Sequence, residues 1–182
     1  MKFTPSTLPD LVLIEPNCYE DERGFFMETF QARLFTQAGL PTNFVQDNHS
    51  NSVKGTLRGL HYQVANVQGK LIRVVSGEIF DIVVDLRRSA PTFGKWVSTV
   101  LTAQNHIQLW VPPGFAHGFY TLSKQADITY KTTDYYNPQA ERTIRWNDPI
   151  LAITWPLISG QPLLISAKDA GGALFQDAEV FP

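Results

Sequence analysis

Residues 78–86 read EIFDIVVDL, a stretch in which two rows of alternate residues differ in character. One row is apolar throughout, and it consists of Phe80, Ile82, Val84 and Leu86. The other row carries two carboxylates, and it consists of Ile79, Asp81, Val83 and Asp85. A period of two residues is the pattern of a β-strand, because successive side chains point to opposite faces of a sheet. The stretch therefore predicts a strand, and Gly77 before it predicts a turn.

Short stretches of strand-like sequence recur on both sides of residues 78–86. The further candidates are residues 55–63, 71–75, 95–101, 106–111, 117–122 and 126–133. Glycine, proline, serine and asparagine mark turns between the later ones, at 89–94, 103–105, 112–114 and 123–125. Many short strands separated by regular turns predict an all-β sandwich or barrel. Small barrels and jelly rolls of this kind enclose a pocket, so inward-pointing polar residues are the candidates for function.

Helical sequence is scarce. Phe30, Leu34, Phe35 and Ala38 follow helical spacing and predict one helix over about residues 29–38, with Gly39 as its stop. The tail from Ser166 predicts a short helix or an ordered loop. No internal repeat, low-complexity tract or linker divides the chain, so we expect one domain over residues 1–182.

Composition excludes several classes of function. The 182 residues are 43% hydrophobic and 12% aromatic, which is enough for a sizeable core. A net charge of −2 gives no bulk attraction to nucleic acid or to an anionic membrane. We find no apolar run of membrane-spanning length and no apolar block of a signal peptide in MKFTPSTLPD. Cys18 is the single cysteine, which excludes an intrachain disulfide, so we expect a soluble cytoplasmic protein.

Residues 55–63, GTLRGLHYQ, place two polar side chains in a strand, where burying them costs free energy. Arg58 and His61 need partners if they are buried. Simple alternation puts them on opposite faces, unless Gly59 marks a β-bulge that shifts the register. The sequence leaves these two arrangements open, and it leaves open whether His61 is a functional residue or a core histidine.

Other polar side chains have a structural and a functional interpretation. Tyr130 shares its face with Ala126, Ile128 and Thr132, so its hydroxyl needs a partner or a substrate. Lys70 precedes an apolar run and is either solvated or functional. Asp169, three residues after Ser166, fits a helix cap, and it equally fits a carboxylate that orients a histidine.

Residues 112–117, PPGFAH, have the P-x-G-x-x-H pattern of the second cupin motif, and residues 55–61 match the G-x5-H start of the first. Metal-binding cupins continue the first motif as H-x-H and add a glutamate. Here Gln63 takes the place of the second histidine, and no glutamate occurs before Glu78. His61 and His117 alone do not make a typical zinc or iron site, so we expect no metal.

A closer resemblance covers nearly the whole chain. The stretches that carry it, in order, are DERGFF (21–26), FVQDNHS (44–50), LRGLHYQ (57–63), QGKLIRV (68–74), GEIFDIVVDLR (77–87), SAPTFGKW (89–96), PPGFAHGF (112–119), YYNP (135–138), WNDP (146–149) and SAKDA (166–170). The chain resembles dTDP-4-dehydrorhamnose 3,5-epimerases. The resemblance implies a cupin-type jelly roll with short helices, and a homodimer that shares strands across its interface. It implies dTDP-4-dehydro-6-deoxy-glucose as substrate, with no cofactor.

The same resemblance assigns roles to particular residues. It implies that His61 is the general base, Asp169 its partner, Tyr130 the general acid and Lys70 the cation that stabilises an enolate. It implies that Tyr136 stacks on thymine. The further nucleotide-sugar contacts that it implies are Arg23, Glu28, Gln46, Asp47, Asn48, Arg58, His117, Glu141 and Lys168.

Four functions remain to be distinguished. The first is the 3,5-epimerase of dTDP-L-rhamnose biosynthesis. The second is an epimerase acting on one carbon, or a ketoisomerase, on a related dTDP-4-keto sugar. The third is a metal-dependent cupin such as a dioxygenase, and the fourth is a sugar-binding cupin without activity. The last predicts that His61, Asp169, Tyr130 and Lys70 need not converge in one pocket.

Overall fold

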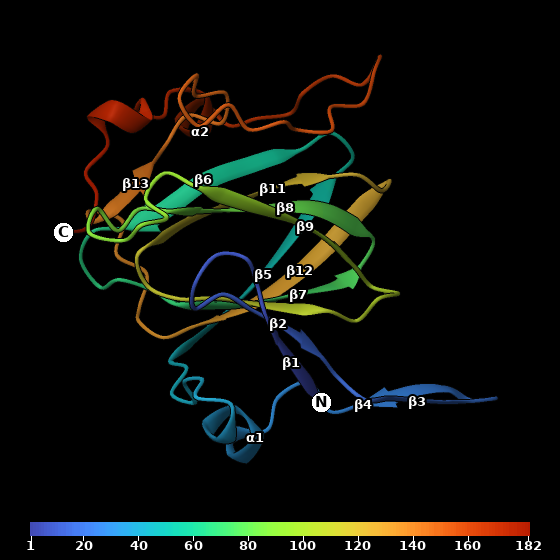
Figure 1. Cartoon of the computed structure of the whole chain (residues 1–182). Coiled ribbons are helices and arrows are strands. Elements are labelled where there is room, and N and C mark those ends of the chain that lie inside the picture. The colour runs from blue at the N-terminus through green and yellow to red at the C-terminus, as the bar shows by residue number, and fades with distance from the viewer.

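The computed structural model describes residues 1–182 as two facing β-sheets with short helices outside them (Figure 1). The six-stranded sheet has the order β1 (Lys2–Pro5), β2 (Val12–Glu15), β10 (Gln108–Val111), β7 (Lys70–Ser76), β12 (Gln125–Thr132) and β5 (Gln46–Val53). The five-stranded sheet has the order β13 (Glu141–Thr143), β6 (Leu57–Gln63), β11 (Phe115–Thr121), β8 (Glu78–Asp85) and β9 (Trp96–Thr102). Neighbouring strands are antiparallel throughout. The prediction of a mainly β, cupin-type jelly roll is confirmed.

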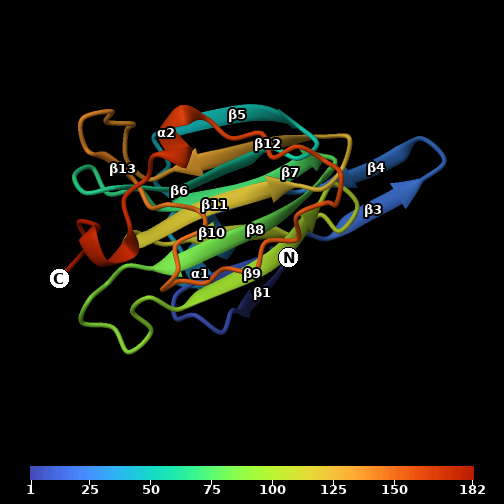
Figure 2. The same ribbon diagram turned by 90° about the horizontal axis from the view of Figure 1, so that it is seen from above.

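Both faces of strand β8 are covered. This explains why both rows of alternate residues in 78–86 contain apolar side chains. Ile79 and Val83 lie in the core between the two sheets. Ile82 and Val84 point the other way and pack under the C-terminal segment, which crosses the outside of the five-stranded sheet (Figure 2). That segment contains the helix α2 (Ala167–Ala170) and the 3₁₀ turn η1 (Phe175–Asp177). The C-terminal part of the chain therefore lies against β6, the strand of GTLRGLHYQ.

The early helix, α1 (Ala32–Gln37), packs on the outside of the six-stranded sheet. Its Phe35 is fully buried against Leu71 and Trp110. The helix is shorter than the predicted span of residues 29–38, because Gln31 is extended and supplies no side-chain cap. Phe30 precedes the helix and still packs on Phe35, with ring centroids 4.7 Å apart. Neither α-helix has the length and apolar surface needed to cross a bilayer.

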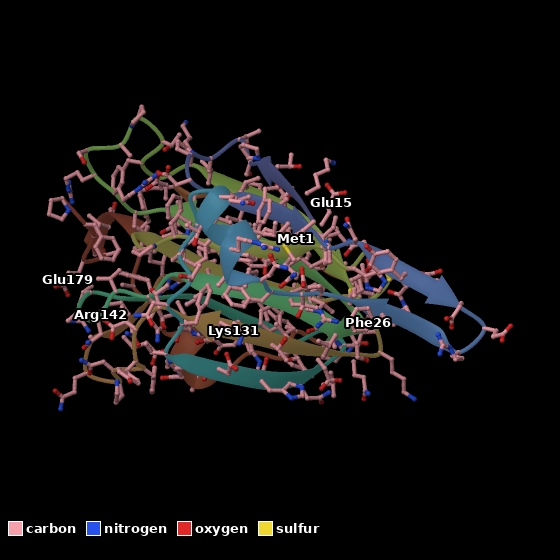
Figure 3. The ribbon with its side chains drawn as sticks, turned by 90° about the horizontal axis from the view of Figure 1, so that it is seen from below. Met1, Glu15, Phe26, Lys131, Arg142 and Glu179 are labelled. Atoms are coloured by element: carbon pink, nitrogen blue, oxygen red, sulfur yellow. The ribbon has the colours of Figure 1, made fainter.

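A two-stranded hairpin, β3 (Cys18–Asp21) with β4 (Gly24–Met27), extends beyond the two sheets (Figures 1 and 2). Its large side chains are open to solvent. Tyr19, Phe25 and Phe26 are 64%, 57% and 72% exposed. Phe26 lies on the hairpin on the same side of the molecule as α1 (Figure 3). The sequence pattern does not predict this hairpin, because four-residue strands carry too little periodicity.

Candidate active site

A β-bulge settles how Arg58 and His61 are oriented. His61 pairs with His117 and Arg58 with Phe119, so Gly59 and Leu60 of β6 lie opposite the single residue Gly118 of β11. The extra residue shifts the alternation by one position. Leu57 and Leu60 consequently share the outer, buried face, whereas Arg58 and His61 share the inner one. Of the two arrangements that the sequence left open, the structure has the bulge.

His61 forms a dyad with Asp169. The Nε2 atom of His61 lies 2.6 Å from Oδ1 of Asp169, and the Gly59 backbone N–H donates to Oδ2 at 3.2 Å. Burial acts to raise the pKa of Asp169, but the bonds from His61 and Gly59 outweigh it and hold that pKa below its ordinary value. The carboxylate is therefore ionised and accepts the Nε2 proton. Nδ1 of His61 is left with the lone pair that a base needs.

Helix α2 fixes Asp169 in this position. Ser166 caps the helix, and its Oγ accepts from the backbone N–H of Asp169 at 3.0 Å. Asp169 thus makes both contacts, since its backbone N–H belongs to the cap while its carboxylate bonds to His61. Asp169 is 3% exposed, so its carboxylate is shielded from water.

Lys70 and Tyr130 face His61 across a pocket of about 240 Å³ between the two sheets. The residues lining it are Ser50, Arg58, His61, Lys70, His117, Gly118, Phe119, Ile128, Tyr130, Tyr136 and Glu141, and we call it the central pocket. Lys70 Nζ lies 3.5 Å from the carbonyl oxygen of His61. Burial lowers the pKa of Lys70 to about 8, although Glu141 and Asp81 act to raise it. Burial also raises the pKa of Tyr130, which keeps its hydroxyl protonated at neutral pH.

A second histidine–carboxylate pair lies beside the first. His117 Nε2 is 2.7 Å from Oδ2 of Asp81, a fully buried residue of β8. Burial raises the pKa of Asp81, against the opposing effect of His117 and Lys70. Asp81 was not among the functional residues expected from the sequence. The sequence did contain a sign of a role for Asp81. Its carboxylate lies in the same row as Ile79 and Val83, and burying a charge there costs free energy unless it has a partner.

Glu141 links two other side chains, Tyr136 and Lys168, at the mouth of the pocket. Its carboxylate accepts from the Tyr136 hydroxyl at 2.8 Å and pairs with Lys168 Nζ at 2.6 Å. Burial acts to raise the pKa of Glu141, but Lys168 and Tyr136 hold it below its ordinary value. Tyr136 is 52% exposed, which leaves its ring free to stack on a flat partner. Gln46 accepts from the Tyr136 backbone N–H at 2.9 Å.

Gln63 has a structural task where metal-binding cupins carry a histidine. Its Nε2 donates to the carbonyl oxygens of Asn66 and Tyr135, at 2.7 and 3.2 Å. Its Oε1 accepts from the backbone N–H of Asn137 at 2.9 Å. Gln63 therefore fixes the loop that carries Tyr136, another role that sequence reasoning missed.

Three of the expected contact residues lie away from the central pocket. Arg23 is at the turn of the β3–β4 hairpin, where its guanidinium binds Asp21. Glu28 follows the hairpin and accepts from Gln31. Asp47 lies on the outer side of β5, paired with Lys131, whereas its neighbours Gln46 and Asn48 line a hollow adjoining the central pocket. Figure 3 shows Lys131 on the outer side of the six-stranded sheet.

The arrangement suits proton transfer to and from carbon. His61 comes from β6 of one sheet, and Tyr130 comes from β12 of the other. A molecule held between them meets a base on one face and an acid on the other. Lys70 offers a positive charge for an oxyanion that forms between them.

Comparison with known proteins agrees with this chemistry. The family model of dTDP-4-dehydrorhamnose 3,5-epimerase matches residues 5–177. A curated dTDP-4-dehydrorhamnose 3,5-epimerase from Pseudomonas aeruginosa is 55% identical over 183 aligned residues, covering 100% of both chains.

Solved structures share the fold over almost the whole chain. A dTDP-6-deoxy-D-glucose-3,5-epimerase from Legionella pneumophila, in complex with dTDP-4-keto-L-rhamnose, is 50% identical with a TM-score of 0.94. The match covers 98% of this chain and 94% of that one. A 3′-monoepimerase from Streptomyces bikiniensis, in complex with dTDP-quinovose, is 30% identical with a TM-score of 0.88, over 94% and 87% of the two chains.

Proposed function

The chain belongs to the family of dTDP-4-dehydrorhamnose 3,5-epimerases, and we propose that it inverts C3 and C5 of dTDP-4-dehydro-6-deoxy-D-glucose. The product is dTDP-4-dehydro-L-rhamnose, a precursor of dTDP-L-rhamnose. The observation that carries this assignment is that His61 and Tyr130 face one pocket from opposite sheets, and that Lys70 lines the same pocket. The enzyme is an isomerase, and its substrate is a dTDP-sugar.

The substrate supplies its own activation. C3 and C5 both lie next to the C4 ketone, so a side-chain base can remove their protons. Nδ1 of His61 takes the proton, and the electron pair moves onto the ketone oxygen to give an enolate. The ammonium of Lys70 stabilises this charge, a contribution that is often the largest single term in catalysis.

Inversion requires the new proton to arrive on the other face. The Tyr130 hydroxyl delivers it, and the carbon–hydrogen bond re-forms as the enolate returns to the ketone. The pocket opens to solvent, from which Tyr130 regains a proton and to which His61 releases one. Repeating the cycle at the second carbon completes the reaction.

The nucleotide is held at the pocket mouth. Arg58 is exposed there and anchored by Ser52, with Nε 3.0 Å from Oγ. Its guanidinium suits the diphosphate, since it can make paired charge-assisted bonds. The exposed ring of Tyr136 stacks on thymine. His117, Glu141, Lys168, Gln46 and Asn48 complete the contacts within this chain.

A homodimer would account for the expected contact residue that lies on the β3–β4 hairpin, away from the central pocket. Arg23 and the aromatic side chains of the β3–β4 hairpin project away from their own central pocket. A second copy would cover these aromatic side chains and receive Arg23 in its site, consistent with the two-fold symmetry common among oligomers. The expected contact of Asp47 with the nucleotide sugar stays a prediction, and within this chain the Asp47 carboxylate pairs with Lys131. We place the enzyme in the cytoplasm, where nucleotide-activated sugars are made.

Proton NMR in D₂O tests the reaction. Metal-stripped protein and dTDP-4-dehydro-6-deoxy-D-glucose should give deuterium at both C3 and C5 of the product. Label at only one carbon would instead show a mono-epimerase, the alternative favoured by the likeness to the Streptomyces bikiniensis enzyme. Binding without any label would refute the mechanism.

A further inference from the structure

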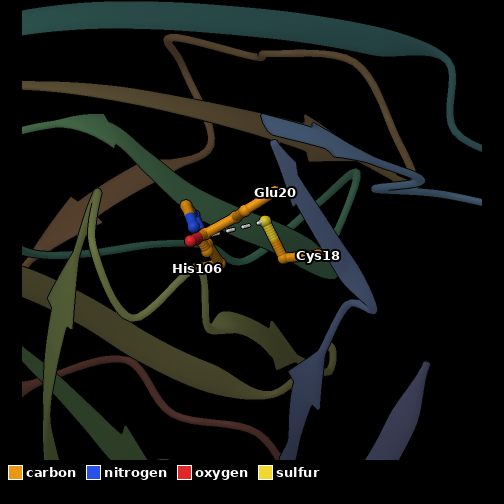
Figure 4. A group of neighbouring side chains, drawn as sticks. All are labelled: Cys18, Glu20 and His106. Atoms are coloured by element: carbon orange, nitrogen blue, oxygen red, sulfur yellow. Dashed lines mark hydrogen bonds between the residues drawn. The ribbon is translucent and has the colours of Figure 1, made fainter. Parts of the chain in front are cut away.

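A cluster of three metal-ligating side chains lies outside the central pocket, where the β3–β4 hairpin meets the loop between β9 and β10 (Figure 4). It consists of Cys18, Glu20 and His106. One ligand atom of each, a thiol sulfur, a carboxylate oxygen and an imidazole nitrogen, lies within 4.8 Å of the other two. None of these residues takes part in the proposed epimerase chemistry.

The backbone brings the three side chains together. Cys18 and Glu20 are two residues apart on β3 and therefore point to the same side of the strand. His106 follows β9 in a loop that Asn105 holds, since its Oδ1 accepts from the backbone N–H groups of Thr102 and Ile107, both at 3.1 Å. The sequence could not reveal this cluster, because about 85 residues separate its two parts.

His106 differs from the other three histidines. His49, His61 and His117 each lie within hydrogen-bond distance of an aspartate. The imidazole of His106 has no hydrogen-bond partner in the protein, and its ring packs on Phe25 with centroids 5.0 Å apart. Cys18 Sγ has only a long contact of 4.0 Å to Glu20 Oε1. The thiol of Cys18 thus has one weak hydrogen bond to Glu20, and the imidazole of His106 has none.

We propose that Cys18, Glu20 and His106 bind a divalent cation of borderline softness, for which Zn²⁺ is the best match. Thiolate, imidazole and carboxylate are the three ligand types that zinc takes in proteins, and three protein ligands leave a fourth position for water. Ligand atoms around one tetrahedral zinc lie about 3–4 Å apart. Small side-chain rotations close the remaining gap, since none of the three side chains is fully buried.

Binding would join two separate parts of the chain. The cation would tie β3, which leads directly to Arg23, to the β9–β10 loop of the barrel. Because Cys18 must lose its proton to become a ligand, affinity should rise with pH and binding should release a proton.

Cobalt(II) titration of chelator-treated protein tests the proposal. Because Cys18 is the single cysteine, a thiolate-to-cobalt charge-transfer band can come only from this site. We expect one cobalt ion per chain and loss of the band when ZnCl₂ is added. Cys18→Ser should abolish the band and weaken Zn²⁺ binding by more than the ~10- to 100-fold that loss of an outer-shell partner costs.

Glu20→Gln and His106→Gln should weaken Zn²⁺ binding as well, whereas His49→Gln is the matched control. It removes a different imidazole that also has a carboxylate beside it, and Zn²⁺ affinity should not change. Absence of the band would overturn the proposal. So would unchanged Zn²⁺ affinity in Cys18→Ser and His106→Gln, or half a cation per chain, which would indicate a bridge between two chains.

Discussion

The backbones of Gly59 and Gly118 lie so close that a Cβ added to Gly59 would sit 2.5 Å from the Cα of Gly118. A Cβ on Gly118 would in turn sit 2.7 Å from the carbonyl oxygen of Arg58. The two strands approach this closely because neither residue has a side chain. The bulge that turns Arg58 and His61 to one side of β6 depends on this approach.

Gly118→Ala should therefore damage the site through the backbone. The added methyl meets the Arg58 carbonyl and must push β6 away from β11. We expect a loss of stability of about 1–3 kcal/mol and a fall in kcat of up to about 100-fold from displacement of His61. Urea unfolding and steady-state kinetics measure the two effects.

Gly160→Ala is the control for this variant, because a Cβ there meets no atom within 4 Å. Its positive φ of 76° costs some stability, but kcat should stay unchanged. Equal kcat in Gly118→Ala and the parent protein would show that the bulge does not position His61.

Asp169→Asn tests the dyad. The amide cannot accept and hold the Nε2 proton as the carboxylate does, so His61 loses the tautomer that leaves Nδ1 free. We expect kcat to fall by on the order of 10²–10⁴, by analogy with other histidine–aspartate pairs. Deuterium exchange into substrate should fall in parallel. Asp177→Asn, an exposed acid of the same tail, should leave both rates unaltered.

Strands in which apolar and polar residues alternate clearly could be predicted from the sequence. A strand made almost entirely of polar residues could not. Residues 78–86 and 126–133 correspond to β8 and β12, and Tyr130 faces inward as its row predicts. Strand β5 reads QDNHSNSV, which lacks an apolar row because one of its faces lines a polar pocket. A pattern of apolar residues cannot reveal a strand whose inward face binds a ligand.

The geometry of the site depended on contacts distant in sequence. The orientation of Arg58 relative to His61 follows from Gly118, about 60 residues away. The dyad joins residues 108 positions apart, and only the resemblance to a known family linked them beforehand. Lys70 could be placed before a strand, but its burial beside Asp81 came from the packing of the two sheets.

Lys70→Met should separate stability from activity. The lysine carries its charge in a pocket that lowers its pKa from 10.5 to about 8, so its charged form costs stability at neutral pH. Methionine has a similar length and no charge. We expect thermal stability to rise, by an amount equivalent to about 1–3 kcal/mol, while kcat falls by on the order of 10²–10³.

The same pKa predicts an alkaline limit for the parent enzyme. Lys70 is protonated below pH 8 and loses its proton as the pH rises through about 8, so the cation that stabilises the enolate disappears. The kcat/KM profile should fall above that pH. Lys70→Arg should move the fall to higher pH, because a guanidinium stays charged. An unmoved alkaline limb would assign it to another group.

Tyr130→Phe should uncouple proton removal from inversion. Without the hydroxyl, His61 still forms the enolate and returns a proton to the same face. Substrate should exchange deuterium at a measurable rate while epimerised product drops sharply. Tyr135→Phe is the control, since that side chain is 61% exposed and outside the pocket. Full product formation by Tyr130→Phe would remove Tyr130 from its role as the acid.

Mixing one impaired and one inactive variant tests whether Arg23 serves the site of a second copy. Arg23→Ala should lower kcat/KM by ~10- to 100-fold, the usual effect of losing a charged hydrogen bond, and His61→Ala should abolish turnover. In a heterodimer, the subunit with intact His61 would receive Arg23 from its partner and become fully active. Half of the dimers in an equal mixture are heterodimers with one competent site of two, so about one quarter of parental activity should return. If tagged heterodimers form and activity does not return, Arg23 acts only within its own chain or not at all.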